Sequence, residues 1–216
     1  MATRNLILVD PPHRDSLKPL SWARPVSSIR IGILTIADKW ERALDAAISW
    51  SVPNYLQSKF PARVENENFL VQGHLLPGQD LRYIISKLGL GEVLVCREQW
   101  VAARLSESQT REFLQNGEWK QFRQQELESQ WVRGIRNLWE IFQWNDLELR
   151  SDFEILTSGR QSAPADPSNR IFGDRFFMEE GAKVMASTIN THTGPVYIGF
   201  QSEIMEGCMI RGALAL

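Results

Sequence analysis

The segment from Val196 to Leu216 constrains the fold more than any other part of this chain. Its aliphatic residues recur at every sixth position, as Ile198, Ile204, Ile210 and Leu216. A helix repeats near 3.6 residues and a strand near 2, so neither element gives this period. A period of six is typical of a triangular coil whose three short sides each point one aliphatic side chain inward. A strand pair with accidental spacing is the alternative, because this is a short run of matches.

The pattern continues backward through Met178 and Val184, which are also six residues apart. Residues 190–195, NTHTGP, break the phase and indicate a loop extruded from one corner of the coil. The chain stops at Leu216, a position of the inward type, and a stack of coils cannot leave its apolar interior open. We therefore expect either further coils in a longer natural protein or another chain that covers the end.

A linker and a long helix separate the coils from the rest of the chain. Residues 157–169, TSGRQSAPADPSN, have almost no apolar side chain. Before them, residues 137–156 have helical apolar spacing, with Asn137 as N-cap and Glu140 in the capping-box position. The sequence thus predicts an α/β domain over residues 1–136, a linking helix and linker over 137–170, and an incomplete six-residue coil stack over 171–216.

Composition excludes several classes of partner. The net charge is −2, from 24 basic and 26 acidic side chains, so bulk charge favours neither nucleic acid nor a membrane surface. The two cysteines, Cys96 and Cys208, lie in different segments and indicate a reducing compartment, not a disulfide framework. The apolar run near the N-terminus is too short for a signal sequence, and no run is long enough for a membrane span. We expect a soluble, cytoplasmic protein.

The first 136 residues alternate strand and helix patterns. The continuous apolar run at residues 6–9 predicts a buried parallel strand, and further strands are expected at 69–71, 92–97, 100–105 and 131–136. Helices are expected at 36–50, 80–88 and 107–123, the last interrupted at Asn116-Gly117.

The loop after the first strand is the first candidate site, because ligands gather at the carboxyl ends of strands in open α/β sheets. Residues 10–28 combine clustered cations with four prolines. Cations on a stiff loop suit phosphate oxygens, although a solvated basic loop would have the same composition. The cationic and histidine candidates here are His13, Arg14, Lys18, Arg24 and, just beyond, Arg30.

Three segments carry a family resemblance: residues 6–41, 138–161 and 177–212. The most specific motif is R-P-V-x-x-x-R-x-G-I-L-T-I-x-x-K-W, residues 24–40. Together they resemble the bifunctional N-acetylglucosamine-1-phosphate uridylyltransferase family, and more closely a group of sugar nucleotidyltransferases related to it. The resemblance implies a Rossmann-like nucleotidyltransferase domain with a mostly parallel sheet, followed by the first coils of a left-handed parallel β-helix.

The implied reaction is nucleotidyl transfer. A sugar 1-phosphate would attack the α-phosphorus of a nucleoside triphosphate and expel pyrophosphate, giving a UDP- or dTDP-sugar, with magnesium bridging the phosphates. The nucleoside triphosphate and the sugar 1-phosphate are the implied partners, and the β-helix of such proteins packs as a trimer.

Two family motifs are altered here. The family's G-x-G-T-R phosphate loop corresponds to residues 10–14, DPPHR, where Arg14 matches but prolines replace amide donors. Arg24 corresponds loosely to the family's phosphate-binding Lys. The family's Gly-Asp, whose Asp binds magnesium, corresponds to Gly73-His74. Imidazole is a poor magnesium ligand, so His74 could equally be structural, and Asp10 could supply a carboxylate instead. The resulting nucleotide- and phosphate-binding candidates are Asp10, His13, Arg14, Lys18, Arg24, Arg30, Gly73 and His74, with Arg14 and Arg24 as catalytic candidates.

Two other functions remain open. Many hexapeptide β-helix proteins transfer an acyl group from acetyl-CoA with a histidine as general base, and His192 on the loop 190–195 would suit that role. That loop could also be a simple polar turn. The third possibility is a non-catalytic module that binds a nucleotide sugar or forms a trimer. The altered phosphate loop favours this module, whereas the basic loop favours the nucleotidyltransferase.

Overall fold

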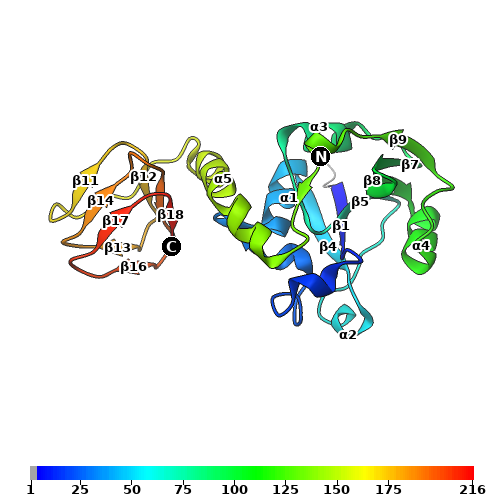
Figure 1. Ribbon diagram of the computed structural model, residues 1–216, viewed down its shortest axis with the longest axis horizontal. Helices are drawn as coiled ribbons and strands as arrows, with labels where there is room; N and C mark the ends of the chain where they lie inside the picture. Colours follow the sequence, from blue (N-terminus) through cyan, green and yellow to red (C-terminus); the bar gives the residue numbers. More distant parts are fainter. Residues whose placement is uncertain (1–3) are drawn as a thin grey trace. The chain divides into compact units, whose positions relative to one another are not determined.

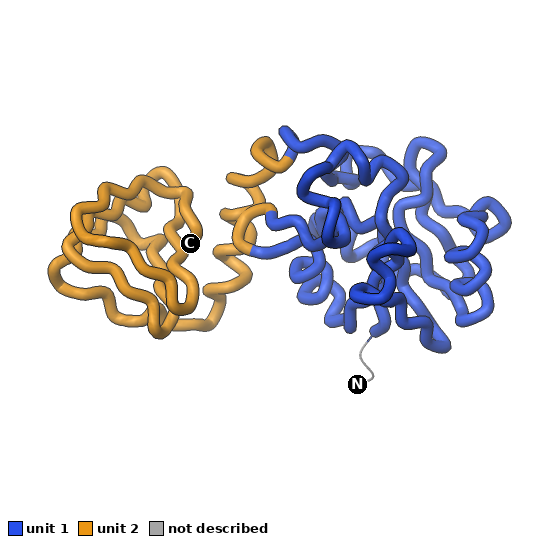
Figure 2. Tube along the Cα trace, turned by 90° about the horizontal axis from the view of Figure 1, so that it is seen from below, with its two compact units in different colours: residues 1–30, 34–140 blue, residues 31–33, 141–216 orange. Residues whose placement is uncertain are grey.

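The computed structural model describes residues 4–216, and its contacts divide the chain into two compact units (Figure 2). The first unit holds residues 1–30 and 34–140. The second holds residues 141–216 together with residues 31–33, the tip of a short hairpin. The boundary falls inside the helix that the sequence predicts as the connection.

The first unit is built on a six-stranded, mostly parallel sheet (Figure 1). Only β8 runs antiparallel to its two neighbours, and the other adjacent pairs are parallel. In spatial order the strands are β4 (Ala46–Ser51), β1 (Arg4–Val9), β5 (Glu67–Gln72), β8 (Gln99–Ser106), β7 (Glu92–Cys96) and β9 (Arg123–Glu126).

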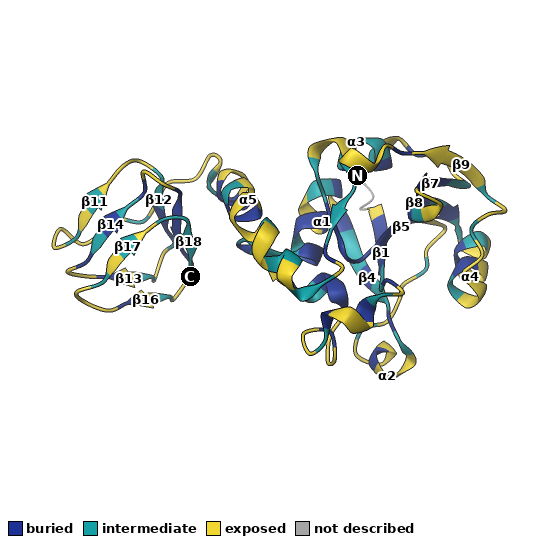
Figure 3. Cartoon of the chain, in the orientation of Figure 1, coloured by how far each residue is buried: buried dark blue, intermediate teal, exposed yellow. Residues whose placement is uncertain are grey.

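The apolar run in β1 is continuous because strands flank it on both sides and both sheet faces are covered. Leu6, Ile7 and Leu8 are completely or almost completely buried. Ile7 lies opposite Ser49 of β4 and Leu70 of β5. Figure 3 shows burial concentrated along these central strands, whereas every residue of β9 is exposed.

Helices and short turns join the strands. In α1, Thr35 and Asp38 form a reciprocal capping box, and the buried Trp40 donates from Nε1 to the Leu75 carbonyl oxygen at 2.8 Å. The helices are α1 (Ile36–Leu44), α2 (Asn54–Gln57), α3 (Gln79–Lys87) and α4 (Glu107–Asn116), with 3-10 turns η1 (Arg14–Leu17), η2 (Val26–Ser28) and η3 (Ser129–Trp131). Two-residue strands pair as β2 (Arg30–Ile31) with β3 (Leu34–Thr35), and as β6 (Leu75–Leu76) with β10 (Arg133–Gly134).

Three expected elements differ from the structure. The helix expected over residues 36–50 ends at Leu44, because Asp45 adopts a left-handed conformation and the next residues pair with β1 as strand β4. The helix expected over 107–123 ends at Asn116, where Gly117 is left-handed. The strand expected over 131–136 is only two residues long, in β10.

The second unit contains most of α5 (Leu138–Thr157), followed by eight short strands. Neither α5 nor any other helix within residues 4–216 is long and apolar enough to cross a membrane. The strands form three parallel sheets. The first contains β11 (Arg170–Phe172), β14 (Thr188–Asn190) and β17 (Met209–Arg211), the second β12 (Phe176–Met178), β15 (Val196–Ile198) and β18 (Leu214–Ala215), and the third β13 (Lys183–Val184) and β16 (Glu203–Ile204).

Successive strands visit the three sheets in the same order in each round, a path consistent with a parallel β-helix. Ile198, Ile204 and Ile210 lie on the three different sheets, as a six-residue side predicts. Met178 stacks on Ile198 and Val184 on Ile204, and these side chains share one apolar core. Leu216, expected to point inward, is 56% exposed.

Candidate functional site

A cavity of about 760 Å³ lies at the carboxyl edge of the parallel strands. The ends of β1, β4 and β5 supply Val9, Ser51 and Gln72, and the following loop supplies Asp10 and His13. Its volume falls within the range typical of pockets for small molecules and cofactors, roughly 300–1,000 Å³. The expectation that a site lies at the end of the first strand is therefore matched by an actual cavity.

Part of the cavity lining is aromatic. Trp100 of β8 and Phe113 of α4 meet edge to face, with ring centroids 5.0 Å apart, and Trp119 also lines the cavity. Large flat rings can stack on the face of a planar ligand, such as a nucleobase. The cavity lining thus combines aromatic and polar side chains.

Arg136 adds a cation to the cavity lining. The segment before Arg136 is fixed by the pairing of β10 with β6. This pairing is continued by the Ile135 amide, which donates to the His74 carbonyl oxygen at 3.0 Å. Ser16 holds the Arg136 carbonyl oxygen through a side-chain hydrogen bond. The Arg136 side chain is exposed, and its guanidinium makes no hydrogen bond or ion pair with any residue that the structure describes. It is therefore available to an anionic ligand.

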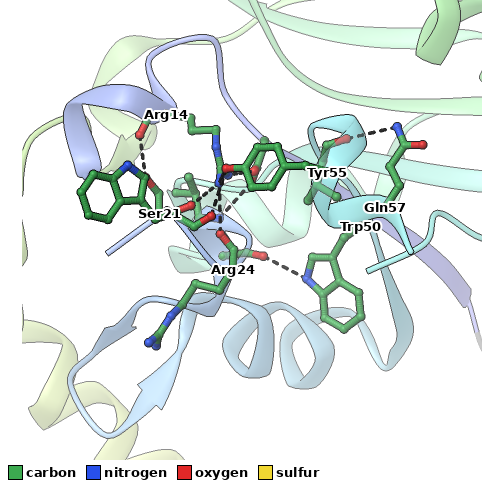
Figure 4. Close-up of polar contacts among 11 residues, drawn as sticks. Arg14, Ser21, Arg24, Trp50, Tyr55 and Gln57 are labelled. Carbon is green, nitrogen blue, oxygen red and sulfur yellow. Dashed lines mark hydrogen bonds and ion pairs between the residues drawn. The ribbon is translucent and has the colours of Figure 1, made fainter. Parts of the chain in front are cut away.

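Arg14, by contrast, is buried, and both terminal nitrogens of its guanidinium have partners within the protein (Figure 4). Its guanidinium donates to the Asp10 carboxylate, to the Ser21 carbonyl oxygen and, at 2.9 Å, to the Tyr55 hydroxyl. Asp10 also accepts from the Val26 amide at 2.8 Å. Burial raises the pKa of Asp10 above its ordinary value, against the opposing effect of the Val26 amide and Arg14. These contacts hold together the loop that follows β1.

The other predicted cations lie outside the cavity wall. Lys18 pairs with Asp15 at 2.9 Å, and Arg30 is exposed on β2. Figure 4 shows the Arg24 side chain pointing away from the Arg14 cluster, which it joins through its carbonyl oxygen alone. Of the eight candidates, only Asp10 and His13 line the cavity in the described part of the chain. The phosphate-binding role of the others remains a prediction.

His13 and His74 form an edge-to-face pair with ring centroids 4.5 Å apart. His74 is 3% exposed, and Gly134 packs so closely that an added Cβ would lie 2.8 Å from its ring. Burial, reinforced by His13 and Arg136, holds the pKa of His74 well below its usual range. Burial also lowers the pKa of His13, partly offset by the Ile135 carbonyl oxygen. Both rings are therefore neutral near pH 7.

The residues at this edge do not fit a magnesium ion held by the protein. Both Asp10 oxygens already accept hydrogen bonds, and a neutral imidazole is a poor magnesium ligand. Within residues 4–216, no three side chains of His, Cys, Asp or Glu are grouped to hold a metal. The Gly73 amide, which a phosphate would need, donates to the Val9 carbonyl oxygen at 2.7 Å.

Several cavity residues escaped the sequence interpretation. Arg136 precedes the predicted helix, and no motif marks it. Trp100 and Trp119 belong to the tryptophan-rich stretch between residues 100 and 144, whose composition alone could have drawn attention to them. Other lining residues without such a signal include Ser51, Gln72, Glu98 and Gln99.

In the second unit, the loop expected at residues 190–195 is found between β14 and β15. His192 is exposed on it, and its backbone amide donates to the Asn190 side chain at 3.0 Å. The position of His192 at a corner is as expected, and its role as a base remains a prediction.

A known protein family matches the larger part of this chain. The model of one family, described as sugar nucleotidyl transferase, matches residues 6–161, which is more than half of the chain. No curated protein matches the sequence. The matched region contains the whole cavity lining and α5. The chain belongs to the sugar nucleotidyl transferase family.

Proposed function

We propose that this protein transfers a nucleotidyl group from a nucleoside triphosphate to a sugar 1-phosphate and releases pyrophosphate. The observation that carries this proposal is the cavity at the carboxyl edge of the sheet, whose lining includes both aromatic side chains and Arg136, which has no partner among the described residues. A nucleobase would stack on the aromatic side chains, and phosphate oxygens would lie near Arg136.

The reaction exchanges one phosphoanhydride bond for another. An oxygen of the sugar 1-phosphate forms a bond to the α-phosphorus, and the bond from that phosphorus to the bridging oxygen breaks, so that pyrophosphate leaves with the electron pair. Such a reaction needs positioned charge more than covalent help from the protein. Arg136 would offset the phosphate charge, and the Arg14–Asp10 pair would hold the loop that shapes the cavity. We assign no step to magnesium.

A finer assignment follows from the motif resemblance. We propose that the product is a UDP- or dTDP-sugar, as in relatives of the bifunctional N-acetylglucosamine-1-phosphate uridylyltransferase. The second unit would be a left-handed hexapeptide β-helix that assembles three copies. The regular alternation of its strands over three parallel sheets supports this proposal.

One observation favours a non-catalytic alternative. The Arg14 guanidinium and both Asp10 oxygens are engaged within the protein, and Pro11 and Pro12 have no amide to offer a triphosphate. A chain of this kind could bind a finished nucleotide sugar without forming it. The acyltransferase alternative would need acetyl-CoA and His192, and the corner position of that loop is its support.

Pyrophosphate release separates these functions. The full chain would be incubated with UTP, dTTP, GTP or CTP and with glucose 1-phosphate or N-acetylglucosamine 1-phosphate, with and without magnesium. Transferase activity predicts pyrophosphate in at least one combination, together with a higher melting temperature. Stabilisation by a nucleotide sugar without any pyrophosphate would favour the binding module. If no triphosphate shifts the melting temperature or yields pyrophosphate, the transferase proposal fails.

A further inference from the structure

A second, smaller pocket of about 70 Å³ lies beside the cavity. It shares Gln72, Gln99, Trp100 and Arg136 with the cavity wall. A ligand in the cavity can therefore extend one small group into this pocket. Its further polar residues are His74, Arg97 and Ser129.

The charged side chains that line the small pocket are all positive in the described part of the chain. Two arginines line it, and neither Asp nor Glu is among its described lining residues, whereas Asp10 and Glu98 line the larger cavity. Arg97 lies in the β7–β8 turn, exposed, with Nη2 donating to the Ser129 hydroxyl at 3.1 Å. The guanidinium fork matches the geometry of phosphoryl oxygens. The pocket thus suits a small anion.

His74 adds a second, independent observation. Its Nδ1 is the one buried side-chain nitrogen or oxygen within residues 4–216 that has no hydrogen-bond partner. A buried polar atom without a partner costs about 1–3 kcal/mol, and His74 Nε2, unlike Nδ1, is not among these buried atoms, so the neutral ring places its N–H at Nε2 and its lone pair at Nδ1. The proton then resides on Nε2, which forms no hydrogen bond within the described chain. His74 therefore has one N–H donor left for a ligand.

We propose that this pocket is a phosphoryl-binding subsite, in which Arg97 and Arg136 pair with the phosphoryl oxygens and His74 donates a hydrogen bond from Nε2. The source of the phosphoryl group rests on the proposed function: it belongs either to the sugar 1-phosphate or to the triphosphate and its pyrophosphate product. The remainder of that ligand occupies the cavity. A neutral donor and two cations bind an anion without the amide-rich loop that the prolines exclude.

The test uses the full chain and isothermal titration calorimetry. The probes are inorganic phosphate, glucose 1-phosphate, pyrophosphate and UTP. Arg97→Ala removes one exposed cation, and Arg211→Ala removes an exposed arginine of the second unit as a matched control. We expect at least one probe to bind the wild type, with a Kd raised about tenfold or more by Arg97→Ala, equivalent to about 1.4 kcal/mol, and changed less than about twofold by Arg211→Ala.

The pattern across probes identifies the source. Weakened binding of glucose 1-phosphate alone assigns the subsite to the acceptor, and weakened binding of UTP and pyrophosphate alone assigns it to the donor. His74→Gln retains an N–H donor and should bind the probes better than His74→Leu. Circular dichroism checks that both variants are folded.

Two results would overturn the subsite: no phosphate probe binds the wild type, or Arg97→Ala binds every probe as the wild type does. These results differ from failure of the proposed function, which is absence of pyrophosphate release. A chain that binds phosphate through Arg97 but never releases pyrophosphate keeps the subsite and loses the transferase. If Arg97→Ala releases pyrophosphate as fast as the wild type and its Kd values are unchanged, the transferase proposal stands and the subsite proposal fails.

Discussion

At the scale of single residues, Arg14 determines the shape of the loop after β1. It joins Asp10 and Ser21 of this loop to Tyr55, which lies 41 residues further along the chain. Removing one partner of a buried ion pair leaves an uncompensated charge, which costs about 3–5 kcal/mol. We expect Arg14→Met to lower the free energy of unfolding by about that amount, measured by urea denaturation of the full chain.

Arg24→Met is the matched control, because the Arg24 side chain is exposed and only its backbone oxygen meets Arg14. Its effect should stay within about 0.5 kcal/mol, as for most surface substitutions. If Arg14→Met were as mild as Arg24→Met, the Arg14 cluster would not hold the loop. In that case Arg14 would be free for the phosphate role that the family motif implies.

His74 makes stability depend on pH in a definite direction. Its pKa in the folded chain lies well below 6.5, so above about pH 6.5 it is neutral in both the folded and the unfolded state and contributes no pH dependence. Below that pH the unfolded chain binds the proton first. Stability therefore falls as the solution becomes more acidic, by up to about 1.4 kcal/mol per pH unit.

We expect His74→Gln to reduce this slope between about pH 6.5 and pH 5, measured as the free energy of unfolding at several pH values. A residual slope is expected from His13, whose pKa burial also lowers. An unchanged slope in His74→Gln would mean that His74 binds its proton equally well in both states.

At the scale of elements, the hairpin tip at residues 31–33 is held against α5 within the second unit. The Gly32 amide donates to the Asn145 side chain at 2.9 Å, and the Ile33 amide to the Asp152 carboxylate at 2.8 Å. Gly32 has φ +78°, and an added Cβ would lie 2.7 Å from backbone atoms of Glu148 and Leu149. This contact explains the glycine in the most specific family motif.

Gly32→Ala should therefore be more destabilising than an ordinary left-handed glycine replacement. Gly159 is the matched control, with φ +70° and no atom within 4 Å of an added Cβ. We expect Gly159→Ala to cost about 1–2 kcal/mol from conformation alone, and Gly32→Ala to cost at least about 2 kcal/mol more because backbone atoms must move. Equal losses in urea denaturation would show that the tip can separate from α5 without cost.

The sequence was informative about elements wherever pattern and local chemistry agreed. The run at residues 6–9 and the helix before the linker are both present. The helix prediction for residues 36–50 was wrong at its end because Ile48 continues the four-residue spacing of Ile36, Trp40 and Leu44 but belongs to strand β4. The helix ends at Asp45, and the next residues are held extended because they pair with β1. Sequence periodicity cannot predict this tertiary contact.

At the scale of the whole molecule, the position of the cavity was predictable and the cation that lines it was not. The strand ending at Val9 indicated the carboxyl edge, where the cavity lies. Arg14 has the charge of a phosphate ligand, but Ser21 and Tyr55 bury it. Arg136, distant in sequence and without a motif, reaches the cavity because β10 pairs with β6. Charge can be read from a sequence, whereas its availability depends on tertiary contacts.

The division into units predicts which fragment can fold alone. A fragment of residues 1–157 keeps Asn145 and Asp152 with the hairpin tip, and a fragment of residues 1–136 loses them. Ile31 and Ile33 are 0% and 8% exposed in the whole chain. Two lost hydrogen bonds at about 1 kcal/mol each, and exposure of part of two isoleucines at about 1.5–3 kcal/mol each, amount to several kcal/mol.

We therefore expect the 1–157 fragment to melt cooperatively and to bind the same triphosphate as the full chain. The 1–136 fragment should melt lower by on the order of 10 °C or should aggregate, because a domain of this size loses about 2–4 °C per kcal/mol or more. Differential scanning calorimetry and size-exclusion chromatography of both fragments test this. If the shorter fragment were equally stable, residues 31–33 would need no helix, and the α/β domain would end before α5, at the boundary of residue 136 that the sequence predicts.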